Sequence, residues 1–131
     1  MVDVVVRPPE LVFYVRSMML SIAAALANTS FRADNEAVLQ DAVAARFDQC
    51  RIEYEREVRL SGKDRIDFLV GNIGIELKVD GSLANLTRQL DRYAMSERIA
   101  ELLVVSTRRT LCRVPTELRG KPVSVICVGG L

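Results

Sequence analysis

Histidine and tryptophan are absent from this sequence of 131 residues, and cysteine occurs only three times. Without histidine, no imidazole can act as a general base or as a metal ligand, so a bound metal would depend on oxygen or thiolate ligands. The cysteines, Cys50, Cys112 and Cys127, are far apart and form no Cys-x-x-Cys pair. This spacing disfavours a zinc site and a disulfide framework, and we expect reduced, buried thiols as in cytoplasmic proteins.

A strong excess of one charge is also missing. The chain has 18 Lys and Arg against 17 Asp and Glu, which gives a net charge of +1. This total does not by itself indicate a nucleic-acid-binding protein, although it allows a local basic patch. Half of the residues are hydrophobic, which is enough for a core, and the length predicts one domain over residues 1–131.

An apolar stretch covers residues 17–27, SMMLSIAAALA. Its final Ala-Leu-Ala triplet resembles a signal-peptidase site, but Asp3 and Glu10 are acidic where a leader is basic. The stretch is also shorter than the roughly 20 apolar residues that cross a bilayer. We therefore expect an internal helix, no membrane partner and a cytoplasmic location.

Hydrophobic periodicity divides the chain into helices and strands. Helical spacing covers about residues 10–27 and 34–47, and the second helix has Asp34 or Ser30 as its N-terminal cap. We then expect three strands, a helix, a strand, one helical turn and a last strand, at residues 51–60, 65–71, 74–79, 83–98, 102–106, 115–119 and 122–128. The short reversal at 71–74 makes the second and third strands antiparallel neighbours. The expected fold is α/β, a mixed sheet with helices on both faces.

Charged side chains interrupt the apolar pattern of the second and third strands. Alternation places Asp67 on one face of its strand and the apolar residues Ile66, Phe68 and Val70 on the other face. Glu76 and Lys78 share one face of the third strand, about 7 Å apart at ~3.3 Å per residue. Asp67 can then approach Glu76, and two adjacent carboxylates repel unless Lys78 or a divalent metal neutralises them. The alternative is a solvated face with an ordinary Glu76–Lys78 ion pair.

Three polar residues on the expected helices could face the same region. Glu36 shares a helix face with apolar residues, namely Leu39, Val43 and Phe47. The alternative for Glu36 is a first-turn residue that interacts with the helix dipole. Gln89 and Tyr93 are four residues apart and therefore lie on one side of their helix. The alternative for Gln89 is a position at the boundary of the buried stripe.

Taken together, these residues resemble the PD-(D/E)xK nuclease superfamily. The chain presents Glu36, Asp67, Glu76-Leu77-Lys78 and Gln89-x-x-x-Tyr93 on helix, strand, strand and helix in that order. The resemblance covers roughly residues 34–106, and the strand at 122–128 also suits it. It implies a restriction-endonuclease-like fold with an αβββαβ core over about 34–128 and an extra N-terminal helix at about 10–27. One departure is Ile66, which stands where many members have proline before the aspartate.

The resemblance also implies roles for individual residues. Asp67, Glu76 and the carbonyl of Leu77 would hold Mg²⁺ or Mn²⁺, and Glu36 would bind a second metal or a metal-bound water. Lys78 would orient or help to deprotonate the attacking water and offset negative charge on the phosphate. Gln89 would position water or phosphate, and Tyr93 would pack or hydrogen-bond behind it. Six residues would contact DNA, mainly through its backbone: Arg65, Arg88, Arg92, Tyr93, Arg108 and Arg109.

The activity that we expect is Mg²⁺-dependent DNA hydrolysis by a structure-selective endonuclease similar to Holliday-junction resolvases. The alternatives are an exonuclease or nickase of the same fold, or a non-catalytic module that binds nucleic acid or assembles with a partner. The apolar first helix either completes the core or forms a homodimer interface, which a small nuclease that cuts two strands would need, and we favour the homodimer.

Overall fold

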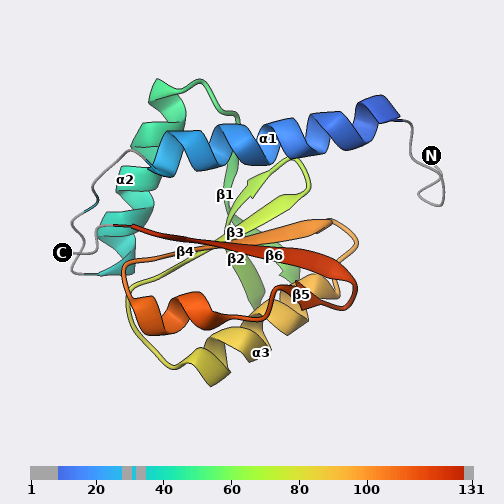
Figure 1. Cartoon of the computed structure of the whole chain (residues 1–131). Coiled ribbons are helices and arrows are strands. Elements are labelled where there is room, and N and C mark those ends of the chain that lie inside the picture. The colour runs from blue at the N-terminus through green and yellow to red at the C-terminus, as the bar shows by residue number, and fades with distance from the viewer. Residues whose placement is uncertain (1–8, 28–30, 32–34, 129–131) are drawn as a thin grey trace.

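The structure is a computed structural model that describes residues 9–27, 31 and 35–128. Its elements follow the order of Figure 1: α1 (Pro9–Ala27), α2 (Glu36–Gln49), β1 (Glu55–Ser61), β2 (Asp64–Val70), β3 (Ile73–Lys78), α3 (Leu83–Ala94), β4 (Glu101–Ser106), the 3₁₀ helix η1 (Arg109–Arg113), β5 (Glu117–Leu118) and β6 (Lys121–Cys127). The expected α/β class is confirmed.

The strands form one mixed sheet in the order β1-β2-β3-β4-β6-β5. β1, β2 and β3 are successive antiparallel neighbours, whereas β3, β4 and β6 run parallel. This arrangement confirms the antiparallel reversal between β2 and β3 and the helical connection from β3 to β4. The two polar strands, β2 and β3, lie inside the sheet rather than at its edge.

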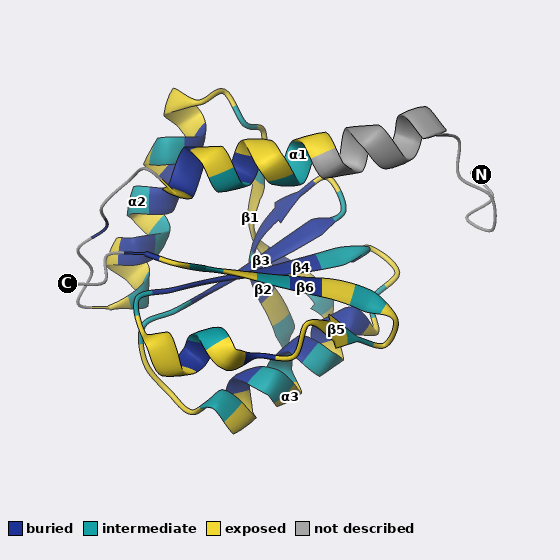
Figure 2. Cartoon of the chain, viewed as in Figure 1, coloured by how far each residue is buried: buried dark blue, intermediate teal, exposed yellow. Residues whose placement is uncertain are grey.

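Helices α1 and α2 cover one face of the sheet, and α3 and η1 cover the other (Figure 1). Each face has its own buried apolar cluster, and the central strands β2, β3 and β4 are buried over most of their length, whereas β1 and β6 are largely exposed (Figure 2). α1 adds Ile22 and Leu26 to the core on its side, so it helps to complete the core of a single chain, while Leu20 is 69% exposed. Among the described helices, none has the length and apolarity needed to cross a membrane.

Several boundaries differ from the sequence-based expectation. The third helix ends at Ala94 rather than Arg98, because its buried stripe ends there and polar residues follow. The helical turn expected at 115–119 is wrong: η1 forms earlier, around buried Leu111, and residues 117–118 form the short strand β5. The cap of α2 is Asn35, whose side chain accepts from the Val38 N–H at 2.9 Å. The proposed caps Asp34 and Ser30 lie outside the described residues.

The strict alternation expected for the second strand is also wrong. Phe68 and Val70 pack on the α1/α2 side, but Ile66 packs in the cluster on the α3 side. The pair Glu57–Asp67 is missing from the register between Arg56–Phe68 and Val58–Ile66, and Glu57 has a φ of 51°, in the left-handed region. Such an irregularity redirects the side chains near it, and here it lies beside the aspartate of interest.

The cysteines correct another expectation. Cys112 in η1 and Cys127 at the end of β6 form a disulfide with a Cα–Cα distance of 6.5 Å, and Cys50 is free and exposed. The sequence spacing did not reveal the pair, because only the packing of η1 against the end of β6 brings these positions together.

Candidate active site

The polar site begins where the pairing of β2 and β3 ends. The ladder between these strands consists of the pairs Val70–Ile73, Leu69–Gly74 and Phe68–Ile75. At the next position, the Asp67 carboxylate replaces a backbone acceptor: its Oδ2 accepts from the Leu77 N–H at 2.8 Å. A side chain therefore takes over the hydrogen bond that continued pairing would have made.

Glu76 lies on β3 with its side chain on the α3 side and is only 3% exposed. Its Oε2 is 3.6 Å from Lys78 Nζ. Its Oε1 is buried and has no hydrogen-bond partner in the described part of the chain. Burial raises the pKa of Glu76 well above its ordinary value, and the charge of Asp67 raises it further, while Lys78 and the Tyr93 hydroxyl oppose the shift. An unpartnered carboxylate oxygen in this environment is energetically costly.

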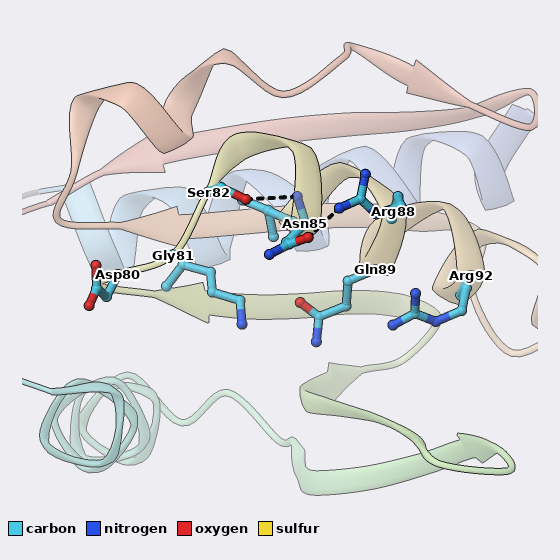
Figure 3. A pocket seen from close by; sticks show the side chains of 9 residues that line it. Asp80, Gly81, Ser82, Asn85, Arg88, Gln89 and Arg92 are labelled. Atoms are coloured by element: carbon cyan, nitrogen blue, oxygen red, sulfur yellow. Dashed lines mark hydrogen bonds between the residues drawn. The ribbon is translucent and has the colours of Figure 1, made fainter.

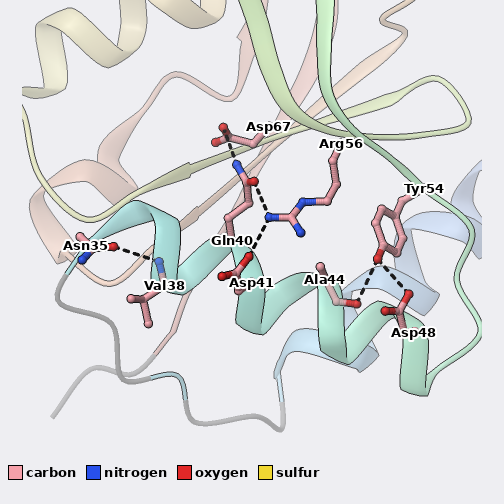
Figure 4. Close-up of polar contacts among 9 residues, drawn as sticks. All are labelled: Asn35, Val38, Gln40, Asp41, Ala44, Asp48, Tyr54, Arg56 and Asp67. Atoms are coloured by element: carbon pink, nitrogen blue, oxygen red, sulfur yellow. Dashed lines mark hydrogen bonds and ion pairs between the residues drawn. The ribbon is translucent and has the colours of Figure 1, made fainter.

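Asp67 is partly buried. Burial raises its pKa, and the hydrogen bond from the Leu77 N–H acts in the opposite direction. Its second oxygen, Oδ1, accepts a hydrogen bond from Gln40 Nε2 at 3.2 Å (Figure 4). Gln40 is a site residue that the sequence interpretation missed. The available signal was its position four residues after Glu36, on the same side of α2.

Lys78 lies between two acids. Its Nζ is 3.6 Å from Glu76 Oε2 and 3.9 Å from Glu36 Oε1. Glu36, the first residue of α2, therefore contacts the lysine, and no contact joins it to the oxygens of Asp67 or Glu76 in the described structure. The four charged residues Glu36, Asp67, Glu76 and Lys78 are brought to one region from α2, β2 and β3, as expected.

Gln89 and Tyr93 form a linked pair on α3. Gln89 Nε2 donates to the Tyr93 hydroxyl at 2.8 Å, and that hydroxyl donates to the Arg65 carbonyl at 3.0 Å. Tyr93 is 1% exposed, so the expected direct contact of Tyr93 with nucleic acid is wrong: the ring has no surface to offer. Its position agrees with the other role expected for it, a residue that hydrogen-bonds behind Gln89, and its hydroxyl also joins α3 to β2.

A groove of about 270 Å³ opens beside Lys78 along α3. Gln89 and Arg92 project into it from the helix (Figure 3). Arg92 also pairs with Asp64 at 3.0 Å, and Arg88 donates to the Asn85 side chain. The lining has a cationic majority among its charged side chains, with Asp80 as its acid: Lys78, Asp80, Gly81, Ser82, Asn85, Leu86, Arg88, Gln89 and Arg92.

The other arginines expected to contact DNA, Arg65, Arg108 and Arg109, do not line this groove. Arg108 pairs with Asp80 at 2.6 Å and so reaches the mouth of the groove. Arg65 is exposed and pairs with Glu57 at 3.6 Å, whereas Arg109 is exposed on η1. Arg88 and Arg92 therefore line the groove, and Arg108 contacts one of its lining residues. Arg65 and Arg109 have neither position.

The donor set can be compared with what a divalent cation needs. Within the described ranges, no group of three or more Asp, Glu or Cys side chains is placed to hold a metal. Two carboxylates and a backbone carbonyl remain, and Mg²⁺ commonly uses one or two carboxylates and keeps its other positions for water and phosphate. Glu76 Oε1 is a buried oxygen that lacks a partner. These residues therefore fit Mg²⁺ or Mn²⁺.

The carbonyl of Leu77 faces the same side as Asp67. The Lys78 carbonyl accepts from the Thr107 N–H at 3.4 Å, on the β4 side of β3. Carbonyls of successive residues in a strand point to opposite edges, and the N–H and carbonyl of one residue point to the same edge. Since the Leu77 N–H bonds Asp67, its carbonyl also points towards β2.

In comparisons with known proteins, no family model, no curated protein and no solved structure matches the chain.

Proposed function

We propose that this protein is a metal-dependent nuclease of the PD-(D/E)xK superfamily, with a restriction-endonuclease-like fold. The observation that carries the proposal is the unpartnered, buried Oε1 of Glu76, which lies in the same site as Asp67 and Lys78. The order helix, three-stranded meander, helix and parallel strand in α2 to β4 supports the same assignment.

A cation accounts for the acid pair better than the protein alone does. Asp67 and Glu76 raise each other's cost of ionisation, and Lys78 reaches only one oxygen of Glu76 within ion-pair distance. Asp67, Glu76 and the Leu77 carbonyl would hold Mg²⁺ or Mn²⁺. Such an ion supplies Lewis-acid stabilisation of the phosphate and lowers the pKa of a bound water.

The remaining residues have roles that follow from their contacts. Lys78 places an ammonium beside the acids, where it offsets negative charge on the phosphate and orients the attacking water. Glu36 holds this ammonium from the other side. Gln89, fixed by its bond to Tyr93, presents its amide to water or phosphate in the groove. Tyr93 is a positioning residue, because its hydroxyl holds Gln89 and also acts on Glu76.

The groove beside Lys78 suits the backbone of DNA. Arg88 and Arg92 line it and Arg108 lies at its mouth, so phosphates can be neutralised there. Its lining contains no aromatic side chain for base stacking among the described residues. Recognition through backbone and shape follows, which is why we propose a structure-selective endonuclease.

The test is a cleavage assay with single-stranded, duplex, flap and four-way-junction DNA in Mg²⁺ or Mn²⁺. We expect metal-dependent cutting that falls by at least about a hundredfold in Lys78→Ala, the scale of losing a positioned charge in a transition state. Lys63→Ala is the matched control, since Lys63 is exposed in the β1–β2 turn. Equal cutting by Lys78→Ala and the parent would remove the role of Lys78, and no metal-dependent cutting of any substrate would reject the nuclease.

A further inference from the structure

A chain of hydrogen bonds runs from Arg56 of β1 through Gln40 of α2 to Asp67 of β2. Gln40 Nε2 donates to Asp67 Oδ1 at 3.2 Å, and Gln40 Oε1 accepts from Arg56 Nη2 at 2.5 Å. The same guanidinium nitrogen is 3.0 Å from Asp41 Oδ1. Figure 4 shows these side chains meeting between α2 and the strands. Three elements, α2, β1 and β2, are therefore connected through one glutamine.

We infer that Gln40 is a positioning residue for the metal-binding carboxylate of Asp67, and that Arg56 fixes the orientation of the Gln40 amide. This inference rests on the proposed metal site. It adds two residues that the family resemblance did not provide.

The chemistry of the two side chains determines which end of the amide meets Asp67. A guanidinium can only donate hydrogen bonds, so the Gln40 oxygen must face Arg56. The amide nitrogen, which can only donate, is then directed at the Asp67 carboxylate. This donor therefore holds one oxygen of the Asp67 carboxylate in a fixed position.

The two hydrogen bonds to Asp67 also fix the plane of its carboxylate. Oδ2 accepts from the Leu77 N–H and Oδ1 accepts from Gln40. An ionised carboxylate has about four lone-pair positions, so these two bonds leave positions on both oxygens for a cation. With β3 on one side and α2 on the other, the carboxylate has little freedom to rotate.

Arg56 is itself held in place rather than free at the surface. Its guanidinium carbon lies 5.6 Å from the centre of the Phe68 ring, and its Nη2 also pairs with Asp41. Phe68 follows Asp67 directly in β2 and is fully buried. The arginine is thus anchored to the same strand segment whose carboxylate it serves, through contacts with both β2 and α2.

The test measures binding of Mn²⁺ alone to the full chain by titration calorimetry. Gln40→Leu keeps the approximate size of the side chain and removes its donor, and we expect binding about ten- to a hundredfold weaker, the range for residues that orient metal ligands. Gln40→Glu keeps the shape and can still pair with Arg56, but it cannot donate, so weaker binding is expected again. Unchanged or tighter binding by either variant would overturn the inference.

A double-variant cycle tests whether Arg56 acts through Gln40. Arg56→Met should weaken Mn²⁺ binding in the parent and have no further effect in Gln40→Leu, because the two residues form one unit. Arg59→Met is the matched control, since Arg59 is also an exposed β1 arginine but bonds the Gly62 carbonyl. Additive losses, or an equal loss in Arg59→Met, would contradict a positioning role.

The outcomes separate this inference from the proposed function. Melting curves without metal verify that each variant is folded before its titration is interpreted. If the parent binds Mn²⁺ and the Gln40 variants bind it equally well, the positioning role fails and the metal site stands. If the folded parent binds no Mn²⁺, both proposals fail.

Discussion

The two ends of the β2–β3 pair differ in how their backbone polar groups are satisfied. Near the connecting turn, Val70 pairs with Ile73 and Leu69 with Gly74, and these residues are buried in the apolar core. At the other end the strands stop pairing, and the Asp67 carboxylate bonds the Leu77 N–H instead. The first end is closed by backbone hydrogen bonds, whereas the second is completed by side chains.

This difference indicates why the site is at the second end. Backbone pairing satisfies donors and acceptors equally and leaves nothing for a ligand. When side chains replace it, not every polar group is satisfied, and one oxygen of Glu76 has no hydrogen-bond partner among the residues that the structure describes. The same two strands can therefore stabilise the fold at one end and offer ligand positions at the other.

The largest expected effect comes from removing the acid at the unpaired end. Asp67→Asn should lose metal-dependent stabilisation, because the neutral amide is a poor ligand beside Glu76. For the parent, Mg²⁺ at a hundred times its dissociation constant should add about 2.7 kcal/mol to the free energy of unfolding. Denaturation with and without Mg²⁺ measures this gain. Asp91→Asn, which alters the Asp91–Arg119 ion pair, should keep this stabilisation by Mg²⁺. Full stabilisation by Mg²⁺ in Asp67→Asn would refute a metal site at the unpaired end of β2 and β3.

Glu76→Gln tests the cost of the buried Glu76 carboxylate to stability in the absence of metal. Because the pKa of Glu76 is raised in the folded protein, the folded state binds more protons than the unfolded state between the ordinary glutamate pKa and the raised one. The free energy of unfolding of the metal-free parent should therefore fall as pH rises from about 4.5 through that window.

The glutamine variant removes the charge and most of this pH dependence. In EDTA at pH 8, its free energy of unfolding should exceed that of the parent by about 1–3 kcal/mol, the cost of an unsatisfied buried group. Urea denaturation at pH 5 and pH 8 provides the measurement. A variant less stable than the parent at pH 8 would mean that the carboxylate is already compensated without a cation.

Gly74→Ala tests the paired end. An added Cβ would lie 2.5 Å from Ile66 Cδ1 and 2.6 Å from Ile99 Cδ1. Overpacking of this kind costs about 1–3 kcal/mol of stability, which chemical denaturation would detect. Mn²⁺ affinity of the folded variant should stay within about twofold of the parent, because the clash falls on the ends of two apolar side chains, Ile66 and Ile99, and on none of the proposed ligands. A large loss of affinity would show that the two ends are not separate.

The smallest effect is expected for Tyr93→Phe. It removes the hydroxyl that joins Gln89 to the Arg65 carbonyl, and a lost hydrogen bond costs about 1 kcal/mol of stability. Tyr54→Phe is the control, since its hydroxyl bonds Asp48 away from the site. DNA cleavage should fall in Tyr93→Phe and not in Tyr54→Phe, and equal cleavage by both would assign Tyr93 to stability alone.

The sequence predicted the relation between β2 and β3 because local rules decide it. A tight reversal makes neighbouring strands antiparallel, and this pairing brings Asp67 and Glu76 to the same end of the two strands even though the alternation in β2 fails at Ile66. Gln40 was not predictable in this way, since its bond to Asp67 joins residues 27 positions apart and depends on how α2 docks. The position of Ile66 was missed because the irregularity at Glu57 belongs to the neighbouring strand.

The pairing of β3 with β4 has a mechanical consequence for the site. Every residue of β3, from Ile73 to Lys78, is in register with β4, so Glu76, Leu77 and Lys78 share one stiff support. Asp67 is attached differently, through its two side-chain hydrogen bonds to β3 and α2. Asp67 would then be the residue that moves to accommodate ions of different radius, while Glu76 and Lys78 keep a constant spacing.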